Sequence, residues 1–276
     1  MSRGVTQIAG MFRGRFKWIG VLLILCYAGF FYISNRQSVP LTGRSQIVDL
    51  SREEETALGV QSYREILSES EVVQSGPAVE QIRRIGRRLA KVSEDPGFRW
   101  EFNLIRSNQA NAFALPGGKV AIFSGILPVA ANEDGLAVIM GHEIAHAIAR
   151  HGAERMAHQE LTQMAGVAAD LGMSDMSLTQ RRTVMGVLGA GARYGIMLPF
   201  SRDHESEADY MGLIFVARAC YDPREAPKVW ERMGKLSGGG TPSEFMSTHP
   251  SSATRIRQFH QWMDEALRIR DEHCGG

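Results

Sequence analysis

Several features are scarce in this sequence of 276 residues, and each scarcity excludes a class of protein. It has only three cysteines, Cys26, Cys220 and Cys274, which are too few for a disulfide framework and lack the spacing of a cysteine zinc site. A bridge between Cys220 and Cys274 would need an oxidising compartment, and the sequence does not predict it. Lys and Arg number 31 against 30 for Asp and Glu, so the charge gives no reason to expect a nucleic-acid partner.

Long uncharged runs are equally scarce, and the clearest one covers residues 18–33. At ~1.5 Å per residue it spans roughly 24 Å, slightly less than a hydrocarbon core of ~30 Å. Residues 1–17 carry basic side chains and no acid, and the run has no good signal-peptidase site. We therefore predict a transmembrane anchor at 18–34, with a cleaved signal sequence as the alternative, and residues 1–17 in the cytoplasm. The broken apolar stretch at 161–198 is more typical of buried helices than of a second span.

Periodicity predicts an α+β fold that is mostly α-helical. Ser51 and Glu54 resemble a capping box that opens a helix to about residue 67, and a second helix begins at Pro77. Residues 98–104 alternate between apolar and polar, as in a half-buried strand, and residues 111–115 and 119–123 flank a Pro-Gly-Gly turn. These segments predict a small antiparallel sheet.

The most informative motif is His-Glu-Ile-Ala-His at 142–146. Positions four apart share one face of a helix, so His142 and His146 can bind one Zn²⁺ while Glu143 addresses a water molecule on the metal. Asn132 can cap this helix, which we expect to continue past His151. The alternative is a surface helix that carries two histidines by coincidence, and the surroundings of the motif argue against it.

A catalytic zinc ion needs a third protein ligand, and Glu205 is the best candidate. It lies on a predicted helix that begins at Asp203, and Asp209, four residues on, can accept the second ring N–H of a ligand histidine. Glu207 is the rival ligand, but two residues from Glu205 it points elsewhere on a helix. The other histidines have no partner at ligand spacing and are expected at the surface: His151, His158, His204, His260 and His273.

Four segments resemble the gluzincin family that includes the CAAX prenyl endopeptidase and the heat-shock membrane proteases. They are residues 111–118, the motif at 142–146, residues 198–209, and Thr248-His249-Pro250 before Arg255. Residues 39–44 resemble the subgroup of the mitochondrial inner-membrane stress protease and its bacterial periplasmic homologues. The resemblance covers about residues 39–260. It departs from the wider family because no tetratricopeptide domain and no set of multiple spans is evident.

The resemblance implies a zincin-like metalloprotease domain at 51–270, between a linker at 35–50 and a tail at 271–276. It implies one Zn²⁺ per chain bound by His142, His146 and Glu205, with Glu143 as general base. Asn111 and Ala112 would lie on the strand edge that receives an extended peptide. The position of His249 can approach the zinc, to stabilise the oxyanion or to cap the open site, although a packed loop histidine is equally consistent with the sequence.

The expected function is hydrolysis of misfolded or mislocalised envelope proteins by a domain in the periplasm or an equivalent space. Substrates would be unfolded proteins or exposed loops, and the oligomeric state is left open. One alternative is a non-hydrolytic assembly factor, against which the intact Glu143 argues. The other is a prenyl-protein endopeptidase, which needs a chamber of many spans, whereas this sequence has one confident candidate span.

Overall fold

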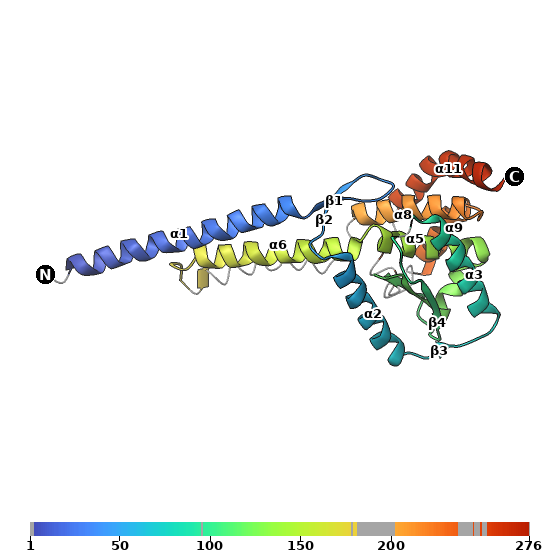
Figure 1. Ribbon diagram of the computed structural model, residues 1–276, viewed down its shortest axis with the longest axis horizontal. Coiled ribbons are helices and arrows are strands. Elements are labelled where there is room, and N and C mark those ends of the chain that lie inside the picture. The colour runs from blue at the N-terminus through green and yellow to red at the C-terminus, as the bar shows by residue number, and fades with distance from the viewer. Residues whose placement is uncertain are drawn as a thin grey trace. The chain divides into compact units, whose positions relative to one another are not determined.

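The computed structural model describes residues 3–94, 96–177, 179–180, 202–236, 245, 249 and 253–275. Residues 198–201, Thr248 and Pro250, which contribute to the resemblance, lie outside this part of the chain. The chain divides into two compact units (Figure 1). The first unit is made of residues 1–38, 45–49 and 153–198, and the second of residues 39–44, 50–152 and 199–276.

The first unit contains helix α1 (Arg3–Ser34), strands β1 (Arg36–Ser38) and β2 (Ser45–Ile47), and most of helix α6 (His151–Gly172). The helices lie side by side: a Cβ at Gly20 would meet Leu171 at 2.7 Å, and Lys17 forms an ion pair with Asp175. Within the described residues, Lys17–Ser34 is the one helical segment long and apolar enough to cross a membrane. Residues 35–50, expected as a linker, include the antiparallel pair β1–β2, whose register joins Gln37 to Gln46.

The second unit holds the remaining described elements (Figure 1). Its longer helices are α2 (Arg52–Ser68), α3 (Pro77–Val92), α5 (Glu133–Ile148), α8 (Arg202–Arg218), α9 (Glu225–Leu236) and α11 (Ala253–Cys274). Its strands are β3 (Val72–Val73), β4 (Glu101–Ile105), β5 (Ala112–Leu115) and β6 (Lys119–Phe123), followed by the short turns η1 (Ser124–Ile126) and α4 (Leu127–Ala130). The mostly helical fold with small sheets is therefore as expected.

The four-stranded sheet has the order β3-β4-β6-β5 and is mixed, which corrects the expectation of a purely antiparallel sheet. The predicted hairpin is confirmed: β5 and β6 are antiparallel, with Leu115 opposite Lys119, and Gly117 and Gly118 take positive φ in the turn. The central pair β4–β6 is parallel, with Asn103 opposite Ala121. This pairing leaves β5 at one edge of the sheet.

The first two predicted helices are confirmed, and they show how local sequence positions the core. The side chain of Ser51 accepts from the backbone N–H of Glu54, whose carboxylate accepts from the N–H of Ser51, so the capping box opens α2. Helix α3 begins with Pro77 and buries the apolar residues spaced along one face, Val79, Ile82, Ile85 and Leu89. This face packs against β4 and α5.

The metal-motif helix ends earlier than expected, which is a correction. Helix α5 stops at Ile148 and α6 begins at His151, because Arg150 takes the left-handed conformation with φ of 61°. Its guanidinium compensates for this strain, since Nε lies 2.7 Å from Glu55 Oε2 and Nη2 donates to the carbonyl of Leu50. The break changes the direction in which His151 projects.

A disulfide joins Cys220 and Cys274, although the sequence did not predict it. Cys220 follows α8 and Cys274 ends α11, so the bond ties the last helix to the helix that carries Glu205. Helix α11 therefore includes residues that were expected as a tail. Cys26 is exposed and unbonded.

Candidate metal centre

Helices α5 and α8 cross in close contact, and this crossing brings the distant motif residues together. The contact depends on Gly141 and Gly212: a Cβ on Gly212 would lie 2.9 Å from the carbonyl carbon of Gly141 and from the N atom of His142. Only glycine allows the two backbones to approach so closely. The crossing therefore places the histidines of α5 opposite the carboxylates of α8.

We expect Gly212→Ala to separate the two helices and to weaken both folding and metal binding. The added methyl group meets backbone atoms that cannot rotate away, so the free energy of unfolding should fall by about 1 to 3 kcal/mol. Urea unfolding and zinc titration measure the two effects. Gly166→Ala is the matched control, because its methyl group would meet no atom within 4 Å. An unchanged stability and zinc affinity in Gly212→Ala would contradict this explanation of the crossing.

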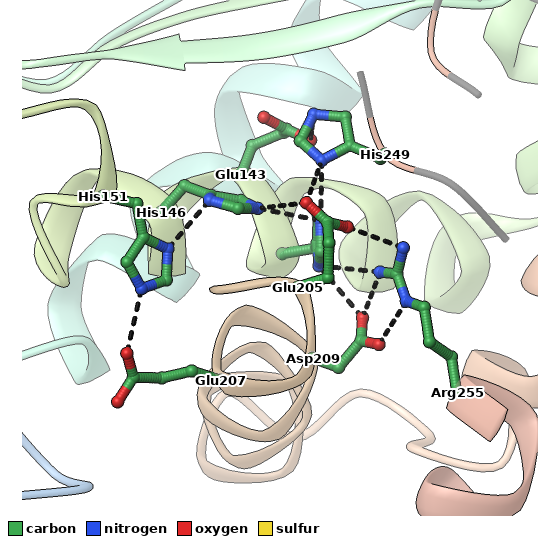
Figure 2. Close-up of polar contacts among 9 residues, drawn as sticks. Glu143, His146, His151, Glu205, Glu207, Asp209, His249 and Arg255 are labelled. Carbon is green, nitrogen blue, oxygen red and sulfur yellow. Dashed lines mark hydrogen bonds and ion pairs between the residues drawn. The ribbon is translucent and has the colours of Figure 1, made fainter. Parts of the chain in front are cut away.

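Four side chains bring their donor atoms close together, and Figure 2 labels three of them, His146, Glu205 and His249. Donor atoms of His142, His146, Glu205 and His249 all lie within 4.8 Å of one another, and all four residues are buried. His142 Nε2 is 3.1 Å from His146 Nε2 and 3.5 Å from Glu205 Oε2. His249 Nδ1 is 2.9 Å from Glu205 Oε1 and 3.3 Å from His142 Nε2. The structure thus brings the three expected ligands and His249 into one cluster.

This donor set fits a zinc ion. Four donors that each lie about 2.0 to 2.1 Å from a tetrahedral zinc ion are about 3.3 Å from one another, close to the separations observed here. Two imidazoles with one carboxylate are also the ligands of known catalytic zinc sites. The close approach of three imidazole nitrogens and a carboxylate has no purpose in an apolar core, because burying such groups is costly.

The pKa values of the two histidines expected as ligands shift in opposite directions. Burial opposes the charged form of His142, but hydrogen bonds with Asp209 and Glu205 raise its pKa to about 9. Burial dominates at His146 and lowers its pKa well below the usual range. Burial would also raise the pKa of Glu205, yet His249, His142 and His146 hold it well below its usual range. The carboxylate is therefore ionised, as a metal ligand must be.

Glu143 projects from helix α5 into the space beside the cluster. Its Oε1 atom is buried without a hydrogen-bond partner in the described part of the chain, and it lies 3.7 Å from His249 Nε2. Burial raises the pKa of Glu143, while the nearby His249 and His142 oppose that shift. A buried carboxylate that borders a candidate metal position is suited to receive a proton.

Asp209 and Arg255 contact two members of the cluster, His142 and Glu205. Asp209 Oδ1 is 3.0 Å from His142 Nδ1, which is the contact that the helix spacing predicts. Arg255 from α11 donates to both oxygens of Asp209 and lies 2.6 Å from Glu205 Oε2, and its guanidinium lies 3.6 Å from the centre of the Trp230 ring. Arg255 belongs to one of the segments that resemble the protease family. No spacing rule predicts its contact with Asp209, because the two residues lie 46 positions apart in the sequence.

His151 and His204 correct the expectation that the remaining histidines lie at the surface. Both are buried, and their rings stack with centroids 4.5 Å apart. Burial lowers the pKa of His151 to about 4, so its ring is neutral. His158, His260 and His273 are exposed, as expected. No sequence signal distinguished His151, because its position depends on the helix break at Arg150.

The expected substrate residues lie at the β5 edge of the sheet, and β5 contacts the metal-motif helix α5. Ala112 begins the edge strand β5, and Asn111 precedes it; both are buried, and the carbonyl of Asn111 accepts from the N–H of Phe123. The backbone N–H of Ala114 on the same strand donates to the carboxylate of Glu143. The edge strand therefore borders the carboxylate beside the candidate metal position.

Comparison with known proteins agrees with this geometry. The model of Peptidase family M48 matches residues 78–263. The chain is 38% identical over 261 residues to the mitochondrial metalloendopeptidase OMA1 of Schizosaccharomyces pombe, a match that covers 93% of this chain and 75% of that protein. It is 34% identical over 275 residues to the protein of the same name from Saccharomyces cerevisiae, with coverage of 93% and 76%. The β-barrel assembly-enhancing protease of Escherichia coli is 28% identical over 229 residues, which are 82% of this chain and 47% of that protein.

Proposed function

The chain belongs to peptidase family M48 and is a metalloendopeptidase, and from that premise we propose how its residues divide the work. His142, His146 and Glu205 hold one Zn²⁺, and Glu143 is the general base. The observation that carries this proposal is the convergence of the four buried donor atoms within 4.8 Å, next to Glu143.

A bound zinc ion would polarise the scissile carbonyl and would lower the pKa of a water molecule to about 7. Glu143 would accept the proton of the attacking water molecule and would later donate it to the leaving amine. Asp209 fixes His142 by accepting from its Nδ1. Arg255 holds one oxygen of Glu205 and leaves the other directed at the cluster.

His249 controls access in this proposal. Its Nδ1 atom takes the place of a fourth donor, 2.9 Å from Glu205 Oε1. A zinc site closed by four protein donors has no position left for water, as in structural zinc sites. His249 therefore caps the resting site and must leave the cluster before hydrolysis.

An extended substrate would add to the free edge of β5. The strand pairs with β6 on one side, and its other side has no strand partner among the described elements. Backbone hydrogen bonds to this edge would select extended conformation more than sequence, so unfolded segments and exposed loops are the expected substrates. Asn111 and Ala112 lie where such a peptide would begin to pair.

Removal and return of the metal test the proposal directly. We expect the purified protein to cleave unfolded casein with zinc, to lose that activity in a chelator, and to regain it when about one equivalent of Zn²⁺ is added back. Metal analysis and gel-based cleavage measure both quantities. A tightly folded protein without exposed loops serves as the control substrate and should stay intact. Undiminished cleavage by protein shown to contain no metal would exclude the proposed mechanism.

We propose further that the protein is anchored in a membrane by Lys17–Ser34, with the catalytic unit in the periplasm or an equivalent space. The apolar helix supports the anchor, and the Cys220–Cys274 disulfide supports an oxidising compartment. The relatives carry mitochondrial and β-barrel assembly names, which favour misfolded or mislocalised envelope proteins as substrates.

Thiol counting tests this topology. When cells are quenched in acid and the protein is alkylated under denaturing conditions, we expect one thiol per chain to react, that of Cys26, and three after reduction. Mass spectrometry of the intact chain gives the count. Three reactive thiols without reduction would place the catalytic unit in a reducing compartment.

A further inference from the structure

A continuous line of polar contacts runs from the cluster through His151 to Glu207 (Figure 2). His146 Nδ1 lies 2.9 Å from His151 Nδ1, and His151 Nε2 lies 2.9 Å from Glu207 Oε2. His151 has no exposed surface, and Glu207 is 7% exposed. The line therefore lies inside the protein, where each contact has to be satisfied by protein atoms.

Glu207 is fixed at the far end by the segment Val39–Arg44. Arg44 Nε donates to Glu207 Oε2 over 2.7 Å, and the hydroxyl of Thr42 donates to Oε1. A carboxylate that receives a charged guanidinium N–H and a hydroxyl acts as a hydrogen-bond acceptor.

An acceptor at this end determines the position of every proton along the line. Because Glu207 only accepts, His151 must carry a proton on Nε2, and in the tautomer with a single ring proton this leaves a lone pair on Nδ1. That lone pair accepts from Nδ1–H of His146. The proton of His146 is then held away from Nε2, which faces the cluster with a free lone pair, as a metal ligand requires.

We propose that His151 and Glu207, supported by Thr42 and Arg44, are positioning residues that orient His146 and hold it in the tautomer that binds metal. This inference rests on the proposed zinc site. Helix α8 then supplies a carboxylate to each ligand histidine: Asp209 reaches His142 directly, and Glu207 reaches His146 through His151. The contact exists because the helix break at Arg150 lets His151 turn back toward the preceding helix.

The test is the zinc dissociation constant of purified full-length variants, measured by competition with a chromogenic chelator. His151→Phe keeps the ring stacked on His204 but removes both nitrogens, and Glu207→Ala removes the acceptor. Loss of such a partner typically weakens metal affinity about 10- to 100-fold, which is the change expected for each variant. Because His151 and Glu207 act through the same hydrogen bond to His146, the effects of the two substitutions should not add. The double variant should bind zinc at most about 2-fold more weakly than the single variant with the lower affinity.

Two further variants separate this role from general packing. Glu207→Gln can still accept from His151 and Arg44, so its affinity should recover to within about 10-fold of the parent. Glu225→Ala is the matched control, since Glu225 is also nearly buried and accepts from Arg232 and Lys228 without touching the cluster. It should lose stability but keep the zinc affinity of the parent. A variant that combines Thr42→Val with Arg44→Ala changes a partly exposed segment, so it serves as the test if His151→Phe fails to fold. It should weaken zinc binding several-fold.

The outcomes distinguish this inference from the proposed function. A parent protein that binds no zinc overturns both. A parent that binds one zinc ion, together with folded His151→Phe and Glu207→Ala variants whose affinities stay within about 2-fold of it, overturns the inference alone. Losses that multiply in the double variant, or that Glu225→Ala matches, would also overturn it, because they indicate independent structural effects.

Discussion

Glu143→Gln should lower kcat/KM for unfolded casein by about 10²- to 10⁴-fold while the protein still binds one zinc ion per chain. The amide keeps the size of the side chain but cannot accept the proton of water at neutral pH. The Oε1 atom of Glu143 has no hydrogen-bond partner in the described part of the chain, and it lies 3.7 Å from Nε2 of His249, which is not one of the three expected ligands, so metal binding should survive. Cleavage assays and metal analysis on the same preparation measure both quantities.

This variant also separates the protease from an assembly factor that only holds its clients. A pure binding protein has no use for a base beside the metal, so the substitution would leave its function unchanged. Glu133→Gln is a suitable control, because Glu133 begins the same helix but makes an exposed ion pair with Arg84. It should cleave like the parent. Equal cleavage by Glu143→Gln and the parent would contradict the assignment of the general base.

Glu205→Ala should lose most zinc binding and, with it, proteolysis. Sites with four ligands bind zinc with about 10 to 16 kcal/mol, so one ligand accounts for about 3 kcal/mol, or about 10²-fold in affinity. The loss should be larger because Arg255, which lies 2.6 Å from Glu205 Oε2, would retain a positive charge near the metal position. Zinc titration of the purified variant measures the change.

Asp203→Ala is the matched control for this prediction. Asp203 lies in the first turn of the same helix and carries the same charge, but its side chain is exposed. It points away from the cluster because residues two apart project from different faces of a helix. Its zinc affinity should equal that of the parent. If Glu205→Ala retained the parent's affinity and activity, Glu205 would not be the third ligand.

The sequence allowed most of the site to be predicted, because its parts follow local rules. The spacing of His142 and His146 on a helix, and of Glu205 and Asp209 on another, requires only the periodicity of an α-helix. The capping box at Ser51 and the hairpin at Gly117 are equally local signals. What the structure adds is the crossing at Gly141 and Gly212, which joins the two helices.

The line through His151 could not be predicted, because it depends on one residue in an unusual conformation. On a continuous helix His151 would lie about 140° around the axis from His146, since five residues turn by about 500°. The left-handed conformation of Arg150 ends α5 and begins α6, and Glu55, 95 residues away, holds Arg150 in place. No local pattern marks such a break without glycine or proline.

The parallel β4–β6 pair and the disulfide are long-range features of the same kind. Alternation identifies a strand but not the direction of its partner, so Asn103 opposite Ala121 was not foreseeable. Cys220 and Cys274 are 54 residues apart, and their pairing depends on how α11 packs against α8. Both features follow from tertiary packing.

We propose that one zinc ion lies between α5 and α8, bound by His142, His146 and Glu205. Diffraction data collected at the zinc absorption edge from crystals of the zinc-loaded protein would locate this ion. We expect one strong anomalous peak about 2.0 to 2.2 Å from Nε2 of both histidines and from a carboxylate oxygen of Glu205. A peak elsewhere, or a Glu205 carboxylate more than about 4 Å from the metal, would contradict it.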